Sequence, residues 1–416
     1  MEAMKILQLT NKPPYPARDG GSIATLSLAV GLAKEGHSVT VLAMNTSKHF
    51  VEPPPPEPGR AGAPYPDLPL TIRMVPVDTR IQWHQALGNL LFSQLPYNGQ
   101  RFLSSDYRQL LRHLLSEEPF DVIILENLYT FLYLTDIEEL SHSTIIMRAH
   151  NVEHEIWERT AAGSTGLKRW YLSLLSKRIK RFELSLINRY DALVPITDRD
   201  AAHFQQFGNT KPVHVLQTGI DPAPLLSDSC SDHLSVAHLG ALDWIPNQEG
   251  IRWFIQEVWP IILREFPETR FHLAGRNAPE EFAREMHAAG IEFHGEIDDA
   301  DDFIQSHALF IVPLFSGSGM RIKLLQYLAA GRAVVATPIG AEGIPVTPGR
   351  ELLLAETASE FASRILELLR SRKHCQEIGK NAATFVKQKY NNQTLIRDFT
   401  RFVIKLTDGA TDHTLD

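Results

Sequence analysis

Short apolar runs alternate with amphipathic stretches along almost the whole chain. The runs have the length of buried strands, and most stretches between them carry apolar residues at the 3.6-residue spacing of a helix. The strands predicted in the first half are residues 4–10, 37–44, 70–77, 120–126, 144–149, 192–197 and 212–218. Those predicted in the second half are residues 234–241, 269–275, 291–297, 308–315, 333–337 and 352–355. This alternation predicts an α/β fold with doubly wound parallel sheets.

The length of the chain and one change in its composition indicate two domains. At 416 residues the chain exceeds what one hydrophobic core usually organises, so two domains of about 200 residues each are expected. Residues 219–232, GIDPAPLLSDSCSD, lack periodicity and are predicted to link domain 1–218 to domain 233–391. The last helix, about 392–406, is expected to pack back on the first domain. Two Rossmann-like domains of this kind bind ligands in a central cleft between them.

The stretch from Ala308 to Thr337 carries the clearest chemical signal. It predicts a strand, a glycine turn at 316–319, a helix and a second strand, so that backbone N–H groups point outward at a helix start and can hold a phosphate. Arg321 and Lys323 lie in the first turn, where cations are unfavourable unless an anion joins them. Gln326 shares the exposed face with Lys323. The alternative is a surface helix with ordinary solvated side chains.

A similar unit opens the chain, where Gly20 and Gly21 lie in the loop between strand 4–10 and a helix over 22–35. Farther along, His150 directly follows a predicted strand, a position where binding residues collect. A lone histidine is more often structural.

Two acidic or histidine-rich segments raise the question of a metal. Glu153 and His154 follow His150, but no third ligand stands at helical spacing. Residues 298–302, DDADD, contain the Asp-x-Asp pattern of a metal site, although capping of the helix that follows is the favoured interpretation. No metal is expected.

Composition narrows the class of protein. A net charge of −8 and a pI near 6.1 argue against general nucleic-acid binding. Cys230 and Cys375 lack metal-ligand spacing, which fits a reducing cytoplasm. The first apolar run is too short for a signal peptide, and no run reaches the roughly 18 residues that cross a bilayer. The arginines and His113 of helical segment 82–115 leave open a contact with the inner face of an anionic membrane, but a packing helix is favoured.

Several motifs together resemble the GT-B glycosyltransferases of the group 1, family 4 type, over almost the whole length. They are Gly20-Gly21 with the pattern LA-x3-L-x3-GH-x-V after it, HNVEHEIWE from residue 150, Gly219-Ile220-Asp221, HLGALDWIPNQEG from residue 238, and GSGMRIKLLQYLAAGRAVVATPIGAEGI from residue 317. The last motif is the most specific.

The resemblance implies roles for single residues. Gly20 and Gly21 match the loop that approaches the donor diphosphate and the acceptor, and His150 matches the residue beside the donor sugar and the reaction centre. The turn that meets the diphosphate or the sugar corresponds to Gly317, Ser318, Gly319 and Met320. Arg321 and Lys323 are well placed for the diphosphate.

This chain departs from the family at two positions of that motif. Ser318 and Gln326 stand where many members carry glutamates, one near the sugar hydroxyls and one on the ribose. Gln326 can still bond a ribose hydroxyl, but without a charged acceptor. The Arg and Lys that many relatives place after the first strand of the second domain are also missing, since Ala241 and Pro246-Asn247 occupy that region. Arg321 and Lys323 would then supply the positive charge alone.

The expected function is therefore that of a cytoplasmic, retaining glycosyltransferase of hexosyltransferase type that acts in polysaccharide or glycoconjugate synthesis. Its expected partners are a nucleotide-sugar donor and a glycan or lipid-linked acceptor, with no nucleic acid and no cofactor. Two alternatives stay open: a nucleotide-sugar epimerase on the same fold, and a non-catalytic nucleotide-sugar-binding protein.

Overall fold

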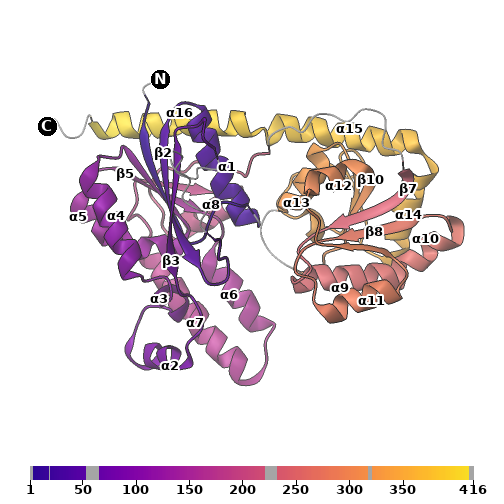
Figure 1. The fold of residues 1–416 in the computed structure, drawn as a ribbon, viewed down its shortest axis with the longest axis horizontal. Helices are drawn as coiled ribbons and strands as arrows, with labels where there is room; N and C mark the ends of the chain where they lie inside the picture. The colour runs from indigo at the N-terminus through magenta and orange to yellow at the C-terminus, as the bar shows by residue number, and fades with distance from the viewer. Residues whose placement is uncertain (1–2, 18, 53–64, 221–231, 317–320, 412–416) are drawn as a thin grey trace. The chain divides into compact units, whose positions relative to one another are not determined.

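The chain folds into two compact units. The computed structural model describes residues 3–17, 19–52, 65–220, 232–316 and 321–411 (Figure 1). Unit 1 comprises Met1–Gly219 and Asn392–Asp416, and unit 2 comprises Ile220–Asn391. Most of the predicted linker, 219–232, lies outside the described residues. Within the described ranges no helix combines the length and apolarity needed to cross a bilayer.

Unit 1 is built on a six-stranded parallel sheet with strand order β3-β2-β1-β4-β5-β6. Its strands are β1 (Lys5–Thr10), β2 (Ser38–Thr46), β3 (Leu70–Val77), β4 (Val122–Glu126), β5 (Thr144–Ala149) and β6 (Ala192–Pro195). The strand predicted at 212–218 is wrong. That segment makes one isolated bridge, between Val213 and Leu193. Pro212 opens it without an N–H to donate, as is usual at a sheet edge.

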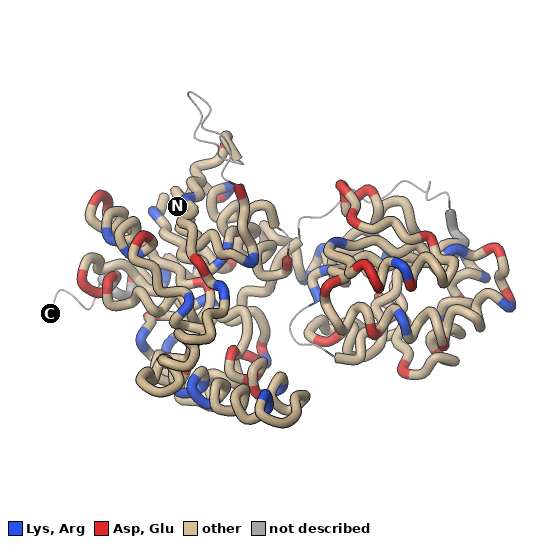
Figure 2. Tube along the Cα trace, turned by 60° about the horizontal axis from the view of Figure 1, so that its bottom comes forward, with Lys and Arg blue, Asp and Glu red and all other residues tan. Residues whose placement is uncertain are grey.

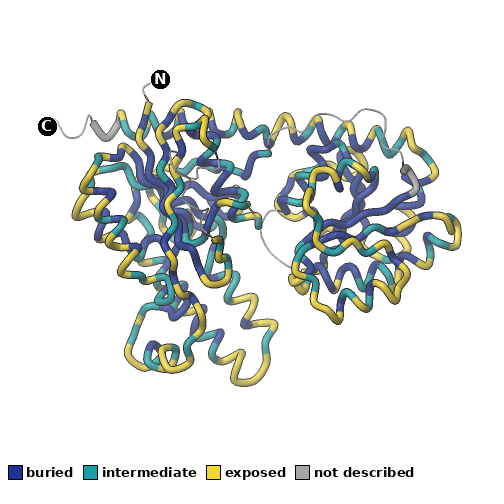
Figure 3. Tube along the Cα trace, in the orientation of Figure 1, coloured by how far each residue is buried: buried dark blue, intermediate teal, exposed yellow. Residues whose placement is uncertain are grey.

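Helices surround this sheet on both faces, as the apolar periodicity predicts. They are α1 (Gly20–Lys34), α2 (Trp83–Phe92), α3 (Tyr97–Gln100), α4 (Ser105–Glu117), α5 (Leu134–Leu140), α6 (Glu153–Ala162), α7 (Gly166–Ser185), α8 (Asp198–Gln206) and α16 (Asn392–Thr411). Helix α16 belongs to unit 1, where Ile396 packs where a side chain on Gly31 of α1 would stand. The burial colours of Figure 3 show the strands as the core of each unit.

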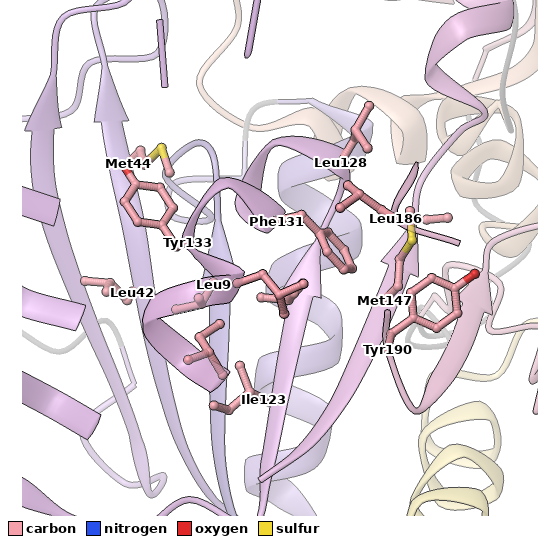
Figure 4. Packing of buried hydrophobic residues seen from close by; sticks show 14 of the residues in the cluster. Leu9, Leu42, Met44, Ile123, Leu128, Phe131, Tyr133, Met147, Leu186 and Tyr190 are labelled. Atoms are coloured by element: carbon pink, nitrogen blue, oxygen red, sulfur yellow. The ribbon is translucent and has the colours of Figure 1, made fainter. Parts of the chain in front are cut away.

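The main apolar core of unit 1 lies on one face of its sheet (Figure 4). Side chains from four adjacent strands, Leu9, Leu42, Ile123 and Met147, lie in one cluster with the rings of Phe131, Tyr133 and Tyr190. A second cluster covers the opposite face and includes residues of α1 and α16. With both faces buried, the sheet can expose functional groups only at its ends.

Unit 2 repeats this design with strand order β12-β11-β10-β7-β8-β9, again all parallel. Its strands are β7 (Asp232–Leu239), β8 (Arg270–Ala274), β9 (Glu292–Gly295), β10 (His307–Val312), β11 (Ala333–Ala336) and β12 (Leu353–Leu354). Its helices are α9 (Ile245–Trp253), α10 (Trp259–Glu265), α11 (Glu280–Ala288), α12 (Ala300–Ser306), α13 (Ile322–Ala329), α14 (Ala358–Arg370) and α15 (Arg372–Lys389). Strand β10 ends before Pro313, which cannot donate to a sheet.

Helix α13 is fixed by two close contacts. The Tyr327 hydroxyl donates to the carbonyl oxygen of Leu239 at 2.6 Å, which fastens the helix to the end of β7. At the other end, α15 approaches so closely that a Cβ on Gly379 would lie 2.0 Å from the carbonyl oxygen of Gly331. Gly331 itself has φ of +68°, a conformation that glycine adopts freely at a helix end.

We expect Gly379→Ala to destabilise unit 2, because its methyl group would push backbone against backbone behind α13. Overpacking of this kind typically costs about 1–3 kcal/mol. Gly88→Ala in α2 is the matched control, since nothing lies within 4 Å of its new Cβ. That change should stabilise the protein by up to about 1 kcal/mol through helix propensity. Thermal unfolding of both variants measures the difference, and equal melting temperatures would contradict this account of the packing.

Candidate active site

A fully buried carboxylate at the end of β4 forms hydrogen bonds with polar side chains of neighbouring strands in unit 1. Glu126 accepts hydrogen bonds from Arg148 Nη1 at 3.0 Å and from Gln8 Nε2 at 2.5 Å. His150 Nε2 pairs with the other carboxylate oxygen. The strands that carry or precede these residues, β1, β4 and β5, are neighbours in the sheet, so their carboxyl ends meet at one edge. Arg148 also donates to the backbone of α1, at the Ala24 carbonyl oxygen, 3.0 Å away.

The charges of this group settle the orientation of His150. Burial raises the pKa of Glu126, but Arg148 and His150 outweigh burial and bring it to about 2. The carboxylate is therefore ionised at neutral pH and can only accept hydrogen bonds. His150 Nε2 must then carry a hydrogen, which fixes the imidazole ring by the same logic as the carboxylate of a catalytic triad. The His150 side chain is 14% exposed, so a small part of it is accessible from outside the unit.

The two glycines near the N-terminus lie in the first turn of α1, not in the loop before it. The helix begins at Gly20, and Asp19 caps it by accepting from Ser22 N at 2.9 Å. Asp19 also binds Lys12 Nζ at 2.5 Å, and a Cβ on Gly21 would lie 2.7 Å from that ammonium group. Burial raises the pKa of Asp19, but the charge and hydrogen bond of Lys12, with the hydrogen bond from Ser22, outweigh burial and bring it to about 2. Gly21 thus leaves room for a lysine across the helix start.

Helix α6 begins beside His150 and has a buried cap of its own. Glu183 of α7 accepts from the backbone N–H groups of Glu153 at 3.0 Å and His154 at 3.2 Å, and it pairs with His154 Nδ1 at 2.5 Å. Burial raises the pKa of Glu153 to about 7, with a further contribution from the charge of Glu183. The backbone N–H and the ring of His154 are thus both bound to Glu183, as part of this cap.

In unit 2 the candidate residues lie at the start of α13. Residues 317–320, which include Gly317, Ser318, Gly319 and Met320, are outside the described residues. Arg321 precedes the helix as its N-cap residue and is 9% exposed, with its guanidinium 5.8 Å from the ring centre of Trp244. Burial lowers the pKa of Arg321, while the charge of Glu342 raises it.

Lys323 and Gln326 follow one helical turn apart on α13 and are both partly buried. Burial lowers the pKa of Lys323, while Asp301 raises it and Arg276 lowers it. The Oε1 atom of Gln326 is buried and has no hydrogen-bond partner among the described residues. A basic group and an acceptor oxygen thus lie on the same stretch of helix as Arg321.

The structure places the predicted site residues in two sets. Gly20, Gly21 and His150 belong to unit 1, and Arg321, Lys323 and Gln326 belong to unit 2. Within the first set, α1 touches the Glu126 group, since Thr25 Oγ1 lies 3.4 Å from Glu126 Oε2.

Sequence reasoning missed Glu126 and Arg148, which interrupt otherwise apolar strands. A charged residue near the carboxyl end of a buried strand is a usable signal, because it must find a partner there. It also missed Lys12 and the contact between Trp244 and Arg321.

The acidic segment 298–302 has the structural role that was favoured for it. Asp299 accepts from the backbone N–H groups of Asp301 at 2.7 Å and Asp302 at 3.1 Å and so caps α12. Across the part of the chain that is described, no three His, Cys, Asp or Glu side chains are grouped so that they could hold a metal ion.

Comparison with known proteins identifies both units. Residues 18–224 match the family model described as Glycosyltransferase Family 4, and residues 233–371 match that of Glycosyl transferases group 1. An uncharacterized 44.6 kDa protein in the cps region of Klebsiella pneumoniae is 24% identical over 94% of this chain and 97% of its own length.

Two solved structures share the fold across nearly the whole chain. HepE of Anabaena, in complex with UDP and glucose, has a TM-score of 0.66 at 14% identity and covers 96% of this chain and 99% of its own. Sucrose-phosphate synthase of Thermosynechococcus elongatus has a TM-score of 0.70 at 13% identity and covers 97% of this chain and 100% of its own. With family models matching both units, the chain belongs to the group 1, family 4 glycosyltransferases and has their GT-B fold.

Proposed function

We propose that this glycosyltransferase is a retaining enzyme of hexosyltransferase type that moves a sugar from a nucleotide-sugar donor to a hydroxyl of a glycan or lipid-linked acceptor. Two cations at the start of α13, the buried Arg321 and the partly buried Lys323, carry the proposal. Burial lowers the pKa of both side chains, so the fold holds them where their charge is poorly hydrated. Such a position favours binding of an anion. The UDP and glucose bound by the Anabaena relative support a nucleotide-sugar donor.

The proposed chemistry places these cations against the leaving group. Glycosyl transfer passes through an oxocarbenium-like state in which negative charge grows on the departing diphosphate. Cations that are already in place stabilise that charge without reorganisation. Arg321 and Lys323 do this without a metal, in our proposal. A phosphate oxygen of the donor takes the acceptor proton on the face from which the diphosphate leaves, which retains the configuration of the sugar.

Binding of the nucleoside is assigned to Gln326. Its buried Oε1 atom lacks a hydrogen-bond partner among the described residues, and a ribose hydroxyl would supply one. Such a bond is neutral and therefore weaker than one to a glutamate. Ser318 and its glycine neighbours remain assigned to the sugar and diphosphate by family resemblance.

His150 is proposed to contact the donor sugar near the reacting carbon, with Glu126 as the residue that positions it. The buried carboxylate holds Nε2 of the ring, so that the rest of the imidazole is presented in one orientation. Gly20 and Gly21 are proposed to let the donor or the acceptor approach the backbone at the start of α1.

A two-stage assay tests this function. A thermal-shift screen with UDP, GDP, ADP and dTDP sugars identifies the donor, because a tightly bound ligand raises the melting temperature. Incubation of that donor with a panel of glycan and lipid-linked acceptors should then release nucleoside diphosphate only when an acceptor is present. Conversion of the donor without an acceptor would indicate an epimerase. Binding without transfer or hydrolysis would indicate a non-catalytic protein.

Replacing either cation of α13 should remove most of the donor binding. We expect Arg321→Ala and Lys323→Ala each to weaken binding of the nucleoside diphosphate at least about tenfold, because each removes a charge-assisted hydrogen bond. The measurement is the thermal shift against nucleotide concentration. Lys387→Ala, an exposed lysine on α15, is the control and should keep the full shift. An undiminished shift in both site variants would exclude them from the donor site.

His150→Ala should separate chemistry from nucleotide binding. We expect kcat to fall at least about tenfold, since a contact near the reacting carbon is lost. The thermal shift caused by the nucleoside diphosphate alone should stay unchanged, because that ligand does not include the sugar. Steady-state kinetics and the same shift assay measure the two effects. An unaltered kcat would show that His150 has only a structural role.

Glu153 should make stability depend on pH near neutrality. Its pKa rises from 4.5 to about 7 on folding, so the unfolded chain loses the proton first, and stability falls as pH rises from about 4.5 to about 7. We expect Glu153→Gln to match the wild type at about pH 4 and to exceed it by up to about 2 kcal/mol at about pH 8. Thermal unfolding at several pH values measures this. Glu153→Asp keeps a carboxyl group and should keep the loss, whereas a constant difference between Gln and wild type would contradict the shifted pKa.

A further inference from the structure

Helix α2 turns its apolar side chains outward. Trp83, Leu87 and Leu91 stand four residues apart on one face and are all exposed, while polar Asn89 is buried. Asn89 is held by Nδ2 bonds to the carbonyl oxygen of Leu95 at 2.9 Å and to Gln100 Oε1 at 2.6 Å. This reverses the usual arrangement of a surface helix. The amide network fixes the helix with its apolar face toward solvent.

The start of α7 is a second exposed apolar segment of unit 1. All five residues from Gly166 to Trp170 are exposed, among them Leu167 at 87% and Trp170 at 60%. Arg178 of α7 donates to the carbonyl oxygens of Asn89 and Leu90 at 3.1 and 2.8 Å, which ties the two helices together. Both helices reach the edge of unit 1 opposite α16 (Figure 1). We call residues 81–92 and 167–170 the α2/α7 tip.

The large exposed hydrophobic side chains of the unit concentrate at this tip. Outside it they stand singly, which is normal for a soluble protein, whereas several exposed apolar side chains gathered on the same segments mark a surface that binds something. The members are Ile81, Trp83, Leu87, Leu91, Phe92, Leu167 and Trp170.

The charge of the tip has one sign. Residues 81–92 and 167–170 contain Lys168 and Arg169 and no Asp or Glu, although the whole chain has a net charge of −8. The flanking segments 79–80, 93–105 and 171–182 add six cations, Arg80, Arg101, Lys177, Arg178, Lys180 and Arg181, of which Arg80 pairs with Asp78 and Lys180 with Glu158. Figure 2 shows Lys and Arg on the helices at this edge.

The arginines of α4, by contrast, serve packing within unit 1. Arg108 pairs with Asp136 at 3.0 Å, and Arg112 pairs with Asp136 and Glu139, each at 2.9 Å. The arginines of α4 are therefore poor candidates for the membrane contact considered for segment 82–115, and the tip is the better one.

We propose that the α2/α7 tip docks unit 1 on an anionic lipid bilayer. Exposed Trp, Phe and Leu side chains enter the headgroup region, and Lys168 and Arg169 meet the lipid phosphates. A second copy of the chain is a poorer occupant, because a two-fold contact would bring the same cations face to face. The inference uses no residue of the proposed active site and stands without the proposed function.

Co-sedimentation of the full-length protein with vesicles tests the proposal. We expect binding to vesicles of phosphatidylcholine mixed with phosphatidylglycerol, little binding to phosphatidylcholine alone, and weaker binding at high salt. Trp83→Ala with Phe92→Ala should weaken the partitioning about tenfold or more, because two large apolar side chains no longer enter the bilayer. Lys168→Glu with Arg169→Glu should weaken it at least about tenfold.

Matched variants away from the tip provide the controls. Phe50→Ala with Leu140→Ala removes two other exposed apolar side chains of unit 1, and Lys380→Glu with Lys387→Glu reverses two exposed charges on α15. Both should bind like the wild type. Equal binding by tip and control variants would overturn the proposal. So would a wild type that ignores anionic vesicles but forms dimers in sedimentation velocity that the tip variants lose. No donor is present, so failure here is separate from failure of the proposed function.

Discussion

The pairing of Glu126 with Arg148 and His150 is the interaction on which the arrangement of unit 1 depends. A carboxylate with no exposed surface is tolerated only because opposite charge and hydrogen-bond donors surround it. Removing one partner from such a buried pair typically costs about 3–5 kcal/mol, so the group locks the carboxyl ends of β4 and β5 into one geometry. A flexible ring at the end of a strand thereby becomes a fixed one.

The basic side chains of unit 2 lie in a different environment. In unit 1 the positive charge of Arg148 is matched by direct contact with Glu126. At the start of α13 the carboxylates of Glu342 and Asp301 act on Arg321 and Lys323 through their charge, yet burial remains the larger effect and lowers both pKa values. Unit 1 thus holds its arginine in a direct ion pair, whereas in unit 2 burial is the largest influence on the pKa of two basic side chains.

The sequence predicts the architecture well because buried parallel strands are nearly continuous apolar runs. The run at Ala308 to Val312 becomes β10, and the leucines after Arg321 become the buried side of α13. Where local signals compete, prediction fails. Segment 212–218 has strand-like composition but opens with a proline and forms only an isolated bridge. Gly20 was predicted to lie in a loop, but the cap formed by Asp19 makes it the first residue of α1. Glu126 was not predicted as a site residue because its partners lie on or after other strands. Only the order of the strands in the sheet brings them close together.

Which face of α2 is exposed could not be predicted from its sequence, for a related reason. The spacing of Trp83, Leu87 and Leu91 predicts an amphipathic helix but does not say which side faces the protein. Hydrogen bonds of Asn89 with Leu95 and Gln100 decide that question, because an amide that is buried must be satisfied. Residues that break a local rule without loss of order are those for which a folded chain has a further use. Glu126, Lys323 and Trp83 each break such a rule: a carboxylate is fully buried, an ammonium group is partly buried, and an indole is exposed.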